Sequence, residues 1–215
     1  MIKDIFPTAI YQTNIPCPDK EWEGMMDLCD EFWQRNQEEI NGHGNKTGDQ
    51  DDQKYFLAHR SKDFYWLNYQ VSESMKKYLD GICGKERYNI YIQKAWTSVV
   101  APRNGRVPEH MHKGSHFSAI YYLRTEGEGG VLTLCATTGF ELVPVNVHER
   151  YLNYEVEVED GDLVIFPSSM IHYVTEFDGD EYRSAIVYDI FVTSPEDVGD
   201  EYENVVTYPN YWSRV

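Results

Sequence analysis

The sequence predicts a mostly β protein in which helices support a sandwich or barrel of short strands. Three observations predict this class. Apolar residues recur at helical spacing in two segments of the first 86 residues. Seven strand-like segments, separated by turn residues, follow from residue 87 onward. The chain has 215 residues, of which 41% are hydrophobic, so one domain of ordinary size can bury a substantial core.

The N-terminal segment is expected to begin with a short strand and continue into a helix. Residues 5–16 are β-like and end at the turn residues Pro16 and Pro18. Asp19 is expected to serve as the N-cap of the helix that follows. The buried face of this helix is formed by apolar residues at spacings of three and four: Trp22, Met25, Met26, Cys29, Phe32 and Trp33.

A polar loop and a second helix complete the helical support, residues 1–86. Residues 41–53 are rich in Gly, Asn and Asp and have almost no apolar content, which predicts a surface loop. The second helix is predicted from about Ser61 to Cys83, because Gly84 suits its C-terminal cap. Its apolar stripe consists of Phe64, Leu67, Val71, Met75, Tyr78, Leu79 and Ile82.

The β core is expected to span residues 87–193, and residues 194–215 form a C-terminal extension. The predicted strands are residues 88–100, 116–124, 129–136, 153–159, 162–167, 171–177 and 182–193. Turn signals such as the RNG, GEGG and DGD segments separate them. Residues 1–215 are therefore predicted to form a single domain.

Charge and cysteine usage exclude several classes of function. The formal net charge is −17, which disfavours binding to a nucleic acid duplex. The four cysteines, Cys17, Cys29, Cys83 and Cys135, contain no CxxC pair, which argues against a thiolate zinc site and a disulfide framework and fits a reducing cytoplasm. No signal-peptide pattern and no run of 18 apolar residues occurs, so neither secretion nor membrane insertion is expected. The oligomeric state is open.

Three of the seven histidines are candidates for a metal site. His110 and His112 are two residues apart, so on an extended strand both imidazoles point to the same side. His172 enters the next strand after the buried segment 163–166 and its turn, where sheet pairing can return it to the first two. Three imidazoles suit a transition metal and leave coordination positions open. The isolated residues His43, His59 and His148 are more typical of hydrogen-bonded or surface histidines.

An arginine and a tyrosine are candidates for binding an anion in the same cavity. If residues 171–177 and 182–193 pair as a hairpin, Arg183 lies on the strand next to His172. Its guanidinium can bind a carboxylate by two parallel hydrogen bonds. Tyr122, at the inner end of its strand, can add a hydroxyl group if it faces inward.

These segments together resemble the Fe(II)/2-oxoglutarate-dependent oxygenases, and most closely the small members from marine bacteria and phages with an H-x-H…H…R pattern. The resemblance rests on Trp96, GRVPEHMHKGSHFSAIYYLR (105–124), GGVLTL (129–134), VEDGDLVIFPSSMIHYV (158–174) and EYRSAIVYDIF (181–191). It is strong from about Trp96 to Val192 and weak in the N-terminal part. It implies a double-stranded β-helix, also called a jelly roll, with a cupin-like core that holds one Fe(II).

Site roles follow from this resemblance. It implies that His110, His112 and His172 are the iron ligands, and that Arg183 and Tyr122 bind the 5-carboxylate of 2-oxoglutarate. The implied reaction consumes O₂, releases succinate and CO₂, and by default hydroxylates a small molecule or peptide. Apolar walls are expected from Ile120, Leu134, Phe166 and Ile186. The chain departs from the common pattern because His112 replaces an Asp or Glu, and Glu109 should point to the opposite face.

Three alternatives stay open. In one, His112 and Gly114 form an H-x-G motif, as in related halogenases, and His110 is not a ligand. In another, the spacing of Gly161, Pro167 and His172 resembles the second motif of cupins, which include isomerases, sensors and dioxygenases independent of 2-oxoglutarate. The third is a binding module with an aromatic surface. Residues 41–60 and 137–152 are the segments expected to cover the mouth of the barrel.

Overall fold

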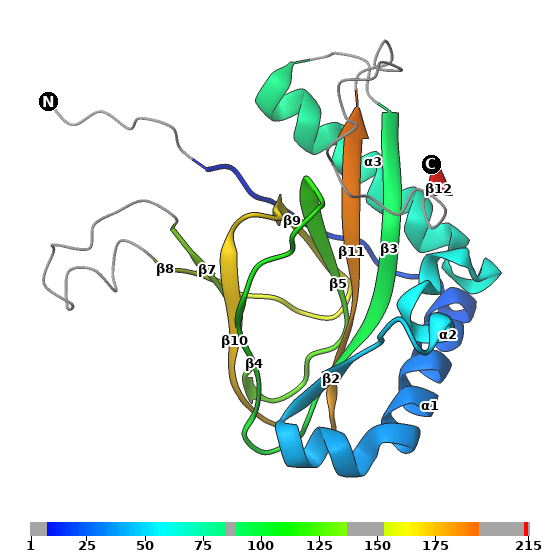
Figure 1. Ribbon diagram of the computed structural model, residues 1–215, viewed down its shortest axis with the longest axis vertical. Coiled ribbons are helices and arrows are strands. Elements are labelled where there is room, and N and C mark those ends of the chain that lie inside the picture. The colour runs from blue at the N-terminus through cyan, green and yellow to red at the C-terminus, as the bar shows by residue number, and fades with distance from the viewer. Residues whose placement is uncertain (1–7, 85–88, 137–152, 194–212, 215) are drawn as a thin grey trace, which may run out of the picture.

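The computed structural model describes residues 8–84, 89–136, 153–193 and 213–214, and it confirms the mostly β class with supporting helices. Two antiparallel sheets face each other as a jelly roll, and the helices lie against the outer face of the larger sheet (Figure 1). In the described residues, no helix is long and apolar enough to cross a bilayer. The four cysteines are free thiols.

The larger sheet has seven strands in the order β1-β9-β5-β11-β3-β12, with β2 also paired to β3. Their bounds are β1 Tyr11–Asn14, β2 Asn45–Thr47, β3 Asn89–Val100, β5 Phe117–Arg124, β9 Asp162–Pro167, β11 Arg183–Thr193 and β12 Ser213–Arg214. β1, β2 and β12 thus join the sheet from outside residues 87–193. Strand β9 has the bounds that the sequence predicts.

The smaller sheet has the order β4-β10-β7-β8, and β6 pairs with β10. Its strands are β4 Gly105–His110, β6 Glu128–Gly129, β7 Leu132–Cys135, β8 Asn153–Val156 and β10 Ile171–Asp178. The predicted hairpin between β10 and β11 is wrong, because β10 pairs with β4, β6 and β7, whereas β11 pairs with β3 and β5 in the other sheet. The turn between them carries the chain from one sheet to the facing one.

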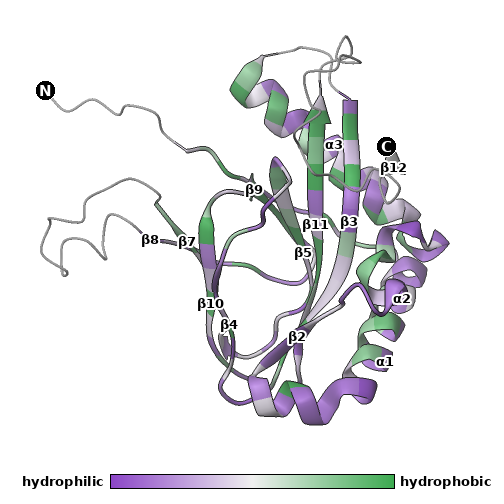
Figure 2. Cartoon of the chain, viewed as in Figure 1, coloured by the Kyte–Doolittle hydropathy of each residue, from purple (hydrophilic) through white to green (hydrophobic). Residues whose placement is uncertain are grey.

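The helices cover the outer face of the larger sheet because the strands β3, β5, β9 and β11 each have an apolar outer side. The helical elements are α1 Asp19–His43, α2 Gln53–Phe56, the 3₁₀ turns η1 Ala58–Arg60 and η2 Lys62–Phe64, and α3 Tyr65–Cys83. On β5, Ala119, Tyr121 and Leu123 join the core beneath α1 and α3, whereas Ile120 and Tyr122 join the core between the sheets. This alternation divides the interior into two apolar layers. In Figure 2, hydrophobic and hydrophilic residues alternate along α1, as expected of a helix with one buried face.

The N-terminal segment differs from the prediction at its element ends. Pro18, in extended conformation, occupies the N-cap position without a side-chain hydrogen bond, so Asp19 is the first helical residue instead of the cap. Residues 41–53 are not one loop, because α1 continues to His43 and ends at Gly44, whose φ of 84° favours glycine. Strand β2 follows and pairs with β3 through backbone bonds that need no apolar side chain.

Candidate metal centre

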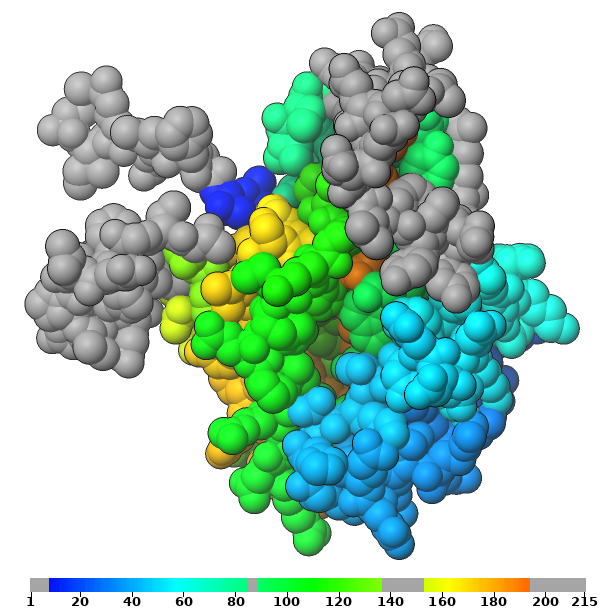
Figure 3. All heavy atoms as spheres, in the orientation of Figure 1, coloured from blue at the N-terminus to red at the C-terminus, as the bar shows by residue number. Residues whose placement is uncertain are grey.

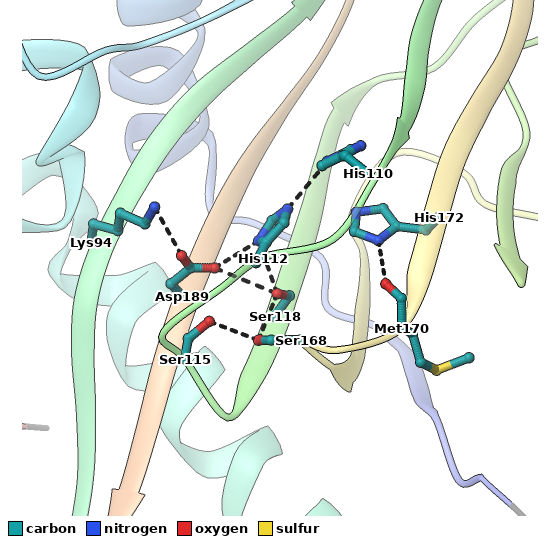
Figure 4. Close-up of polar contacts among 9 residues, drawn as sticks. All are labelled: Lys94, His110, His112, Ser115, Ser118, Ser168, Met170, His172 and Asp189. Carbon is teal, nitrogen blue, oxygen red and sulfur yellow. Dashed lines mark hydrogen bonds and ion pairs between the residues drawn. The ribbon is translucent and has the colours of Figure 1, made fainter. Parts of the chain in front are cut away.

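Three imidazoles converge at the open end of the jelly roll. His110 is the last residue of β4, and it lies opposite His172 in the register of β10. His112 follows His110 by two residues, and its backbone N–H donates to the Ser168 carbonyl at 3.0 Å. One ring nitrogen from each histidine lies within 4.8 Å of the others. The structure therefore brings together the three histidines that the sequence singles out (Figure 4).

Hydrogen bonds fix the orientation of each ring. His110 Nδ1 lies 2.8 Å from the Pro108 carbonyl, and His172 Nδ1 lies 2.9 Å from the Met170 carbonyl. His112 Nδ1 lies 2.7 Å from a carboxylate oxygen of Asp189. Since all three partners only accept, each Nδ1 carries a proton, and Nε2 is the atom that each ring can offer to a metal.

This arrangement fits a cation. The Nε2 atoms of His110 and His112 lie 3.3 Å apart, so both can face one ion. Burial, opposed by the Met170 carbonyl, lowers the pKa of His172 to about 3, and burial also lowers the pKa of His110. Both imidazoles are therefore neutral at pH 7, which is the form that binds metals.

A polar network that the sequence analysis missed lies behind His112. Asp189 on β11 is 1% exposed, and its second carboxylate oxygen lies 3.0 Å from Lys94 Nζ. Burial raises the pKa of Asp189, but the His112 and Lys94 contacts outweigh it, and the pKa is held below its usual value. Ser118 Oγ lies 3.0 Å from His112 Nδ1 and 2.9 Å from Ser168 Oγ.

Arg183 and Tyr122 lie in the cavity that the histidines line. Arg183 is 5% exposed, and among the described residues it has no carboxylate partner within salt-bridge distance. Its guanidinium carbon stands 5.0 Å from the centre of the Tyr122 ring. A Cβ at Gly130, where φ is 63°, would meet Arg183 Cδ at 3.1 Å, so the glycine leaves room for this side chain.

Burial is also the main electrostatic influence on this pair. It raises the pKa of Tyr122 to about 12 against the opposing charge of Arg183, and it lowers the pKa of Arg183. Within the part of the chain that the structure describes, the buried Tyr122 hydroxyl has no hydrogen-bond partner of normal geometry. A buried cation without a carboxylate and an unsatisfied hydroxyl, side by side in one cavity, are groups that could hold an anion.

Arg183 reaches the cavity by a route other than the predicted hairpin. Arg183 projects from the larger sheet, whereas His110 and His172 project from the smaller one. The pair formed by Arg183 and Tyr122 therefore faces two of the imidazoles across the interior. Every second side chain of β11 points toward the facing sheet, namely those of Arg183, Ala185, Val187 and Asp189. By the same alternation Ile186 points outward to the helices, so its prediction as a wall of the site is wrong.

The other apolar walls lie between the sheets. Ile120 lines the cavity, and Leu134 and Phe166 belong to the apolar cluster around it. Outside the cavity, a groove leads past His110 and His112 between β2 and β4. Figure 3 shows this hollow between the cyan and green surfaces. Thr47, Gly48 and Phe56 line it, so part of the predicted covering segment 41–60 lies at the mouth.

The remaining candidates are placed as follows. His43 ends α1, and His59 is buried in η1; neither belongs to the imidazole cluster. Glu109 is exposed, and the cluster of metal-ligating side chains does not include it. His148 and residues 137–152 lie outside the described residues.

The fold and the site define a jelly-roll protein with a three-imidazole centre beside a buried arginine. Residues 94–189 match the family described as "Putative 2OG-Fe(II) oxygenase", which confirms the resemblance seen in the sequence. The family description names Fe(II) and 2-oxoglutarate, and an oxygenase uses O₂, in agreement with the predicted cofactors. No curated protein matches the chain.

Solved structures agree at the level of the fold. A prolyl hydroxylase from Trichoplax adhaerens, in complex with a hypoxia inducible factor peptide, has a TM-score of 0.56 at 13% identity, covering 85% of this chain and 83% of its own. The carbocyclase SnoK from nogalamycin biosynthesis has a TM-score of 0.57 at 13% identity, covering 91% and 85%. This chain spans 58% of an oxidoreductase from Burkholderia pseudomallei, with 12% identity, 61% coverage of this chain and a TM-score of 0.46.

Proposed function

We propose that this protein is a non-haem Fe(II)- and 2-oxoglutarate-dependent dioxygenase that hydroxylates a small molecule or a peptide. The observation that carries this proposal is the pairing of two sites in one cavity, a cluster of three imidazoles and a buried arginine with a tyrosine. The first suits a divalent metal, and the second suits the carboxylate of a chelating acid.

In this proposal His110, His112 and His172 hold the iron through Nε2. The donor set fits, because all three Nδ1 atoms are engaged with acceptors and the rings are already turned toward one another. Imidazole is a normal ligand of Fe(II), and three of them leave positions for 2-oxoglutarate and O₂. Because His110 lies within the cluster, its position favours the H-x-H assignment over H-x-G.

Arg183 and Tyr122 bind the 5-carboxylate of 2-oxoglutarate in the proposed complex. A carboxylate between them would satisfy the Tyr122 hydroxyl and the guanidinium donors at once. When bound, Fe(II) with 2-oxoglutarate and O₂ supplies the oxidising chemistry, and succinate and CO₂ are released. The chain binds and orients the cosubstrate, and the apolar side chains of Ile120, Leu132 and Val187 keep water from the cavity.

The groove beside His110 and His112 is the proposed entrance for the substrate. Its walls combine the rings of Phe56 and Trp96 with the cationic Lys113. Either a small molecule or a peptide segment can enter from the surface. The similar structures include a prolyl hydroxylase bound to a peptide and a carbocyclase, so the fold accommodates more than one oxidative outcome.

The test measures cosubstrate and product in one reaction. Purified protein is incubated with Fe(II), 2-oxoglutarate, O₂ and a metabolite extract; succinate is quantified, and mass spectrometry searches for a product heavier by one oxygen atom. Succinate formation that requires Fe(II) supports the proposal, and the heavier product supports hydroxylation. Metal binding without any 2-oxoglutarate response contradicts it and favours a cupin, to which the spacing of Gly161, Pro167 and His172 also points.

A further inference from the structure

Asp189 lies in one rung of the larger sheet with two polar neighbours. In the strand register Asp189 is opposite Lys94 of β3 on one side and opposite Ser118 of β5 on the other. One carboxylate oxygen accepts from His112, and the second lies 3.0 Å from Lys94 Nζ. The carboxylate is therefore fully partnered although it is almost completely buried.

We propose that Asp189 is a positioning residue of the metal centre, which aims His112 at the metal and supplies, from behind the imidazole, the negative charge that a three-histidine ligand set lacks. This inference rests on the proposed function, because it assigns a role to Asp189 only if His112 is a ligand. Figure 4 shows Asp189 and Lys94 on one side of the His112 ring and the cluster on the other.

The three histidines are held in different ways, and this difference singles out Asp189. His110 and His172 each bond to a carbonyl two residues earlier in the chain, that of Pro108 and that of Met170. His112 lies beyond the end of β4. Its Nδ1 lies 2.7 Å from the Asp189 carboxylate, 77 residues away in the facing sheet, and 3.0 Å from the neutral hydroxyl of Ser118. Its orientation therefore depends on one remote carboxylate more than on its own strand.

The charge of the site follows from the same contacts. Three neutral imidazoles bring no charge to a divalent metal, whereas a set with one Asp or Glu brings a negative charge. Asp189 places a negative charge one ring away from the metal, and a hydrogen bond from a ligand to a carboxylate makes the imidazole a stronger donor. Lys94, whose side chain is 34% exposed, holds the carboxylate in place from outside, with its ammonium 4.7 Å from the Trp96 ring.

The experiment uses Co(II) as the probe, because it gives both visible absorption and paramagnetic proton shifts. Dissociation constants are measured under anaerobic conditions for the wild-type chain and for Asp189→Ala, Asp189→Asn and Lys94→Met. Proton NMR of each Co(II) protein then counts the shifted, exchangeable Nδ1–H signals of the ligand imidazoles. The matched control is Asp162→Asn, which changes another buried carboxylate of the larger sheet, one bonded to Gln12 and Asn14.

We expect three exchangeable signals in the wild-type protein. Asp189→Ala should weaken Co(II) binding about 10- to 100-fold and lose the His112 signal to exchange with water. Asp189→Asn keeps an acceptor oxygen, so it should retain three signals with an intermediate loss of affinity. Lys94→Met should lose much less Co(II) affinity than Asp189→Ala, since it removes one contact of the carboxylate and leaves the His112 contact. Asp162→Asn should match wild type in both measurements.

Two outcomes overturn the inference alone. The first is that Asp189→Ala binds Co(II) with wild-type affinity and keeps three signals. If circular dichroism shows that the alanine variant does not fold, the corresponding outcome is that Asp189→Asn binds Co(II) with wild-type affinity and its His112 signal does not move. The other is a loss of affinity in Lys94→Met as large as in Asp189→Ala, which assigns the pair a purely structural role. If the wild-type chain binds no Co(II), the proposed metal centre fails, and this inference fails with it.

Discussion

Replacing Arg183 by methionine should separate 2-oxoglutarate binding from metal binding. Arg183 is buried and lies over the Tyr122 ring without a carboxylate partner among the described residues. Methionine keeps an unbranched apolar stem against that ring and removes the guanidinium. The imidazole cluster does not contact Arg183 through any hydrogen bond, so its geometry should persist.

The size of the effect follows from the lost hydrogen bonds. Two parallel charge-assisted bonds contribute about 1.5–3 kcal/mol each, and the Tyr122 hydroxyl remains to bind one carboxylate oxygen. A net loss of about 3–4 kcal/mol weakens 2-oxoglutarate binding by two to three orders of magnitude, since each 1.4 kcal/mol is about tenfold. Burial lowers the pKa of Arg183, which means that burying its charge costs free energy. Methionine removes that cost, so the free energy of unfolding of the ligand-free protein should not fall.

The assay is an anaerobic titration of the Fe(II) protein with 2-oxoglutarate, followed by the visible charge-transfer band of the chelate. The matched control is Arg124→Met, since Arg124 also lies over a tyrosine ring, with its guanidinium carbon 4.4 Å from the centre of Tyr182. It pairs with Glu181 outside the cavity. The control should bind 2-oxoglutarate as wild type does. Equal affinity of Arg183→Met and Arg124→Met would refute the assigned role.

Three further changes test the site. His172→Ala should lower the iron content per chain to near zero, whereas His43→Ala, at the end of α1, should retain it. Elemental analysis measures the iron, and a normal iron content in His172→Ala would contradict the ligand assignment. Tyr122→Phe should weaken 2-oxoglutarate binding about tenfold without lowering the melting temperature, since the hydroxyl that it removes has no partner among the residues that the structure covers. A lower melting temperature with unchanged affinity would instead indicate a structural role. In the metal-free protein, the unfolded chain takes up a proton at His172 near pH 6.5 and the folded chain only near pH 3, so the free energy of unfolding should fall on acidification across that range. Urea unfolding measures this fall, and an equally steep fall in His172→Asn would argue against His172 as its cause.

The imidazole cluster could be predicted from the sequence because its parts have local signals. Two histidines two residues apart share a side of an extended segment, and His172 follows a buried strand whose bounds are read from its flanking turns. The pairing of β10 could not be predicted in this way. Neighbouring strands usually pair, but here the turn after β10 crosses to the other sheet.

Asp189 was missed because it stands in an apolar strand and carries no motif. A signal was nevertheless present. A lone carboxylate in a buried strand requires a partner, and Asp189 is an even number of residues from Arg183, so the two share a side of β11. The same count excludes Ile186, which is an odd number of residues from Arg183. The identity of the partners, Lys94 and His112, depends on the strand register and had to come from the structure.

The most direct measurement of the central claim is a crystal structure of the Fe(II) protein grown without oxygen, with anomalous diffraction recorded at the iron edge. We predict a single anomalous peak within coordination distance of the Nε2 atoms of His110, His112 and His172, with the Asp189 carboxylate still on His112 Nδ1. A peak elsewhere, or an iron atom bound by fewer than all three imidazoles, would contradict this account.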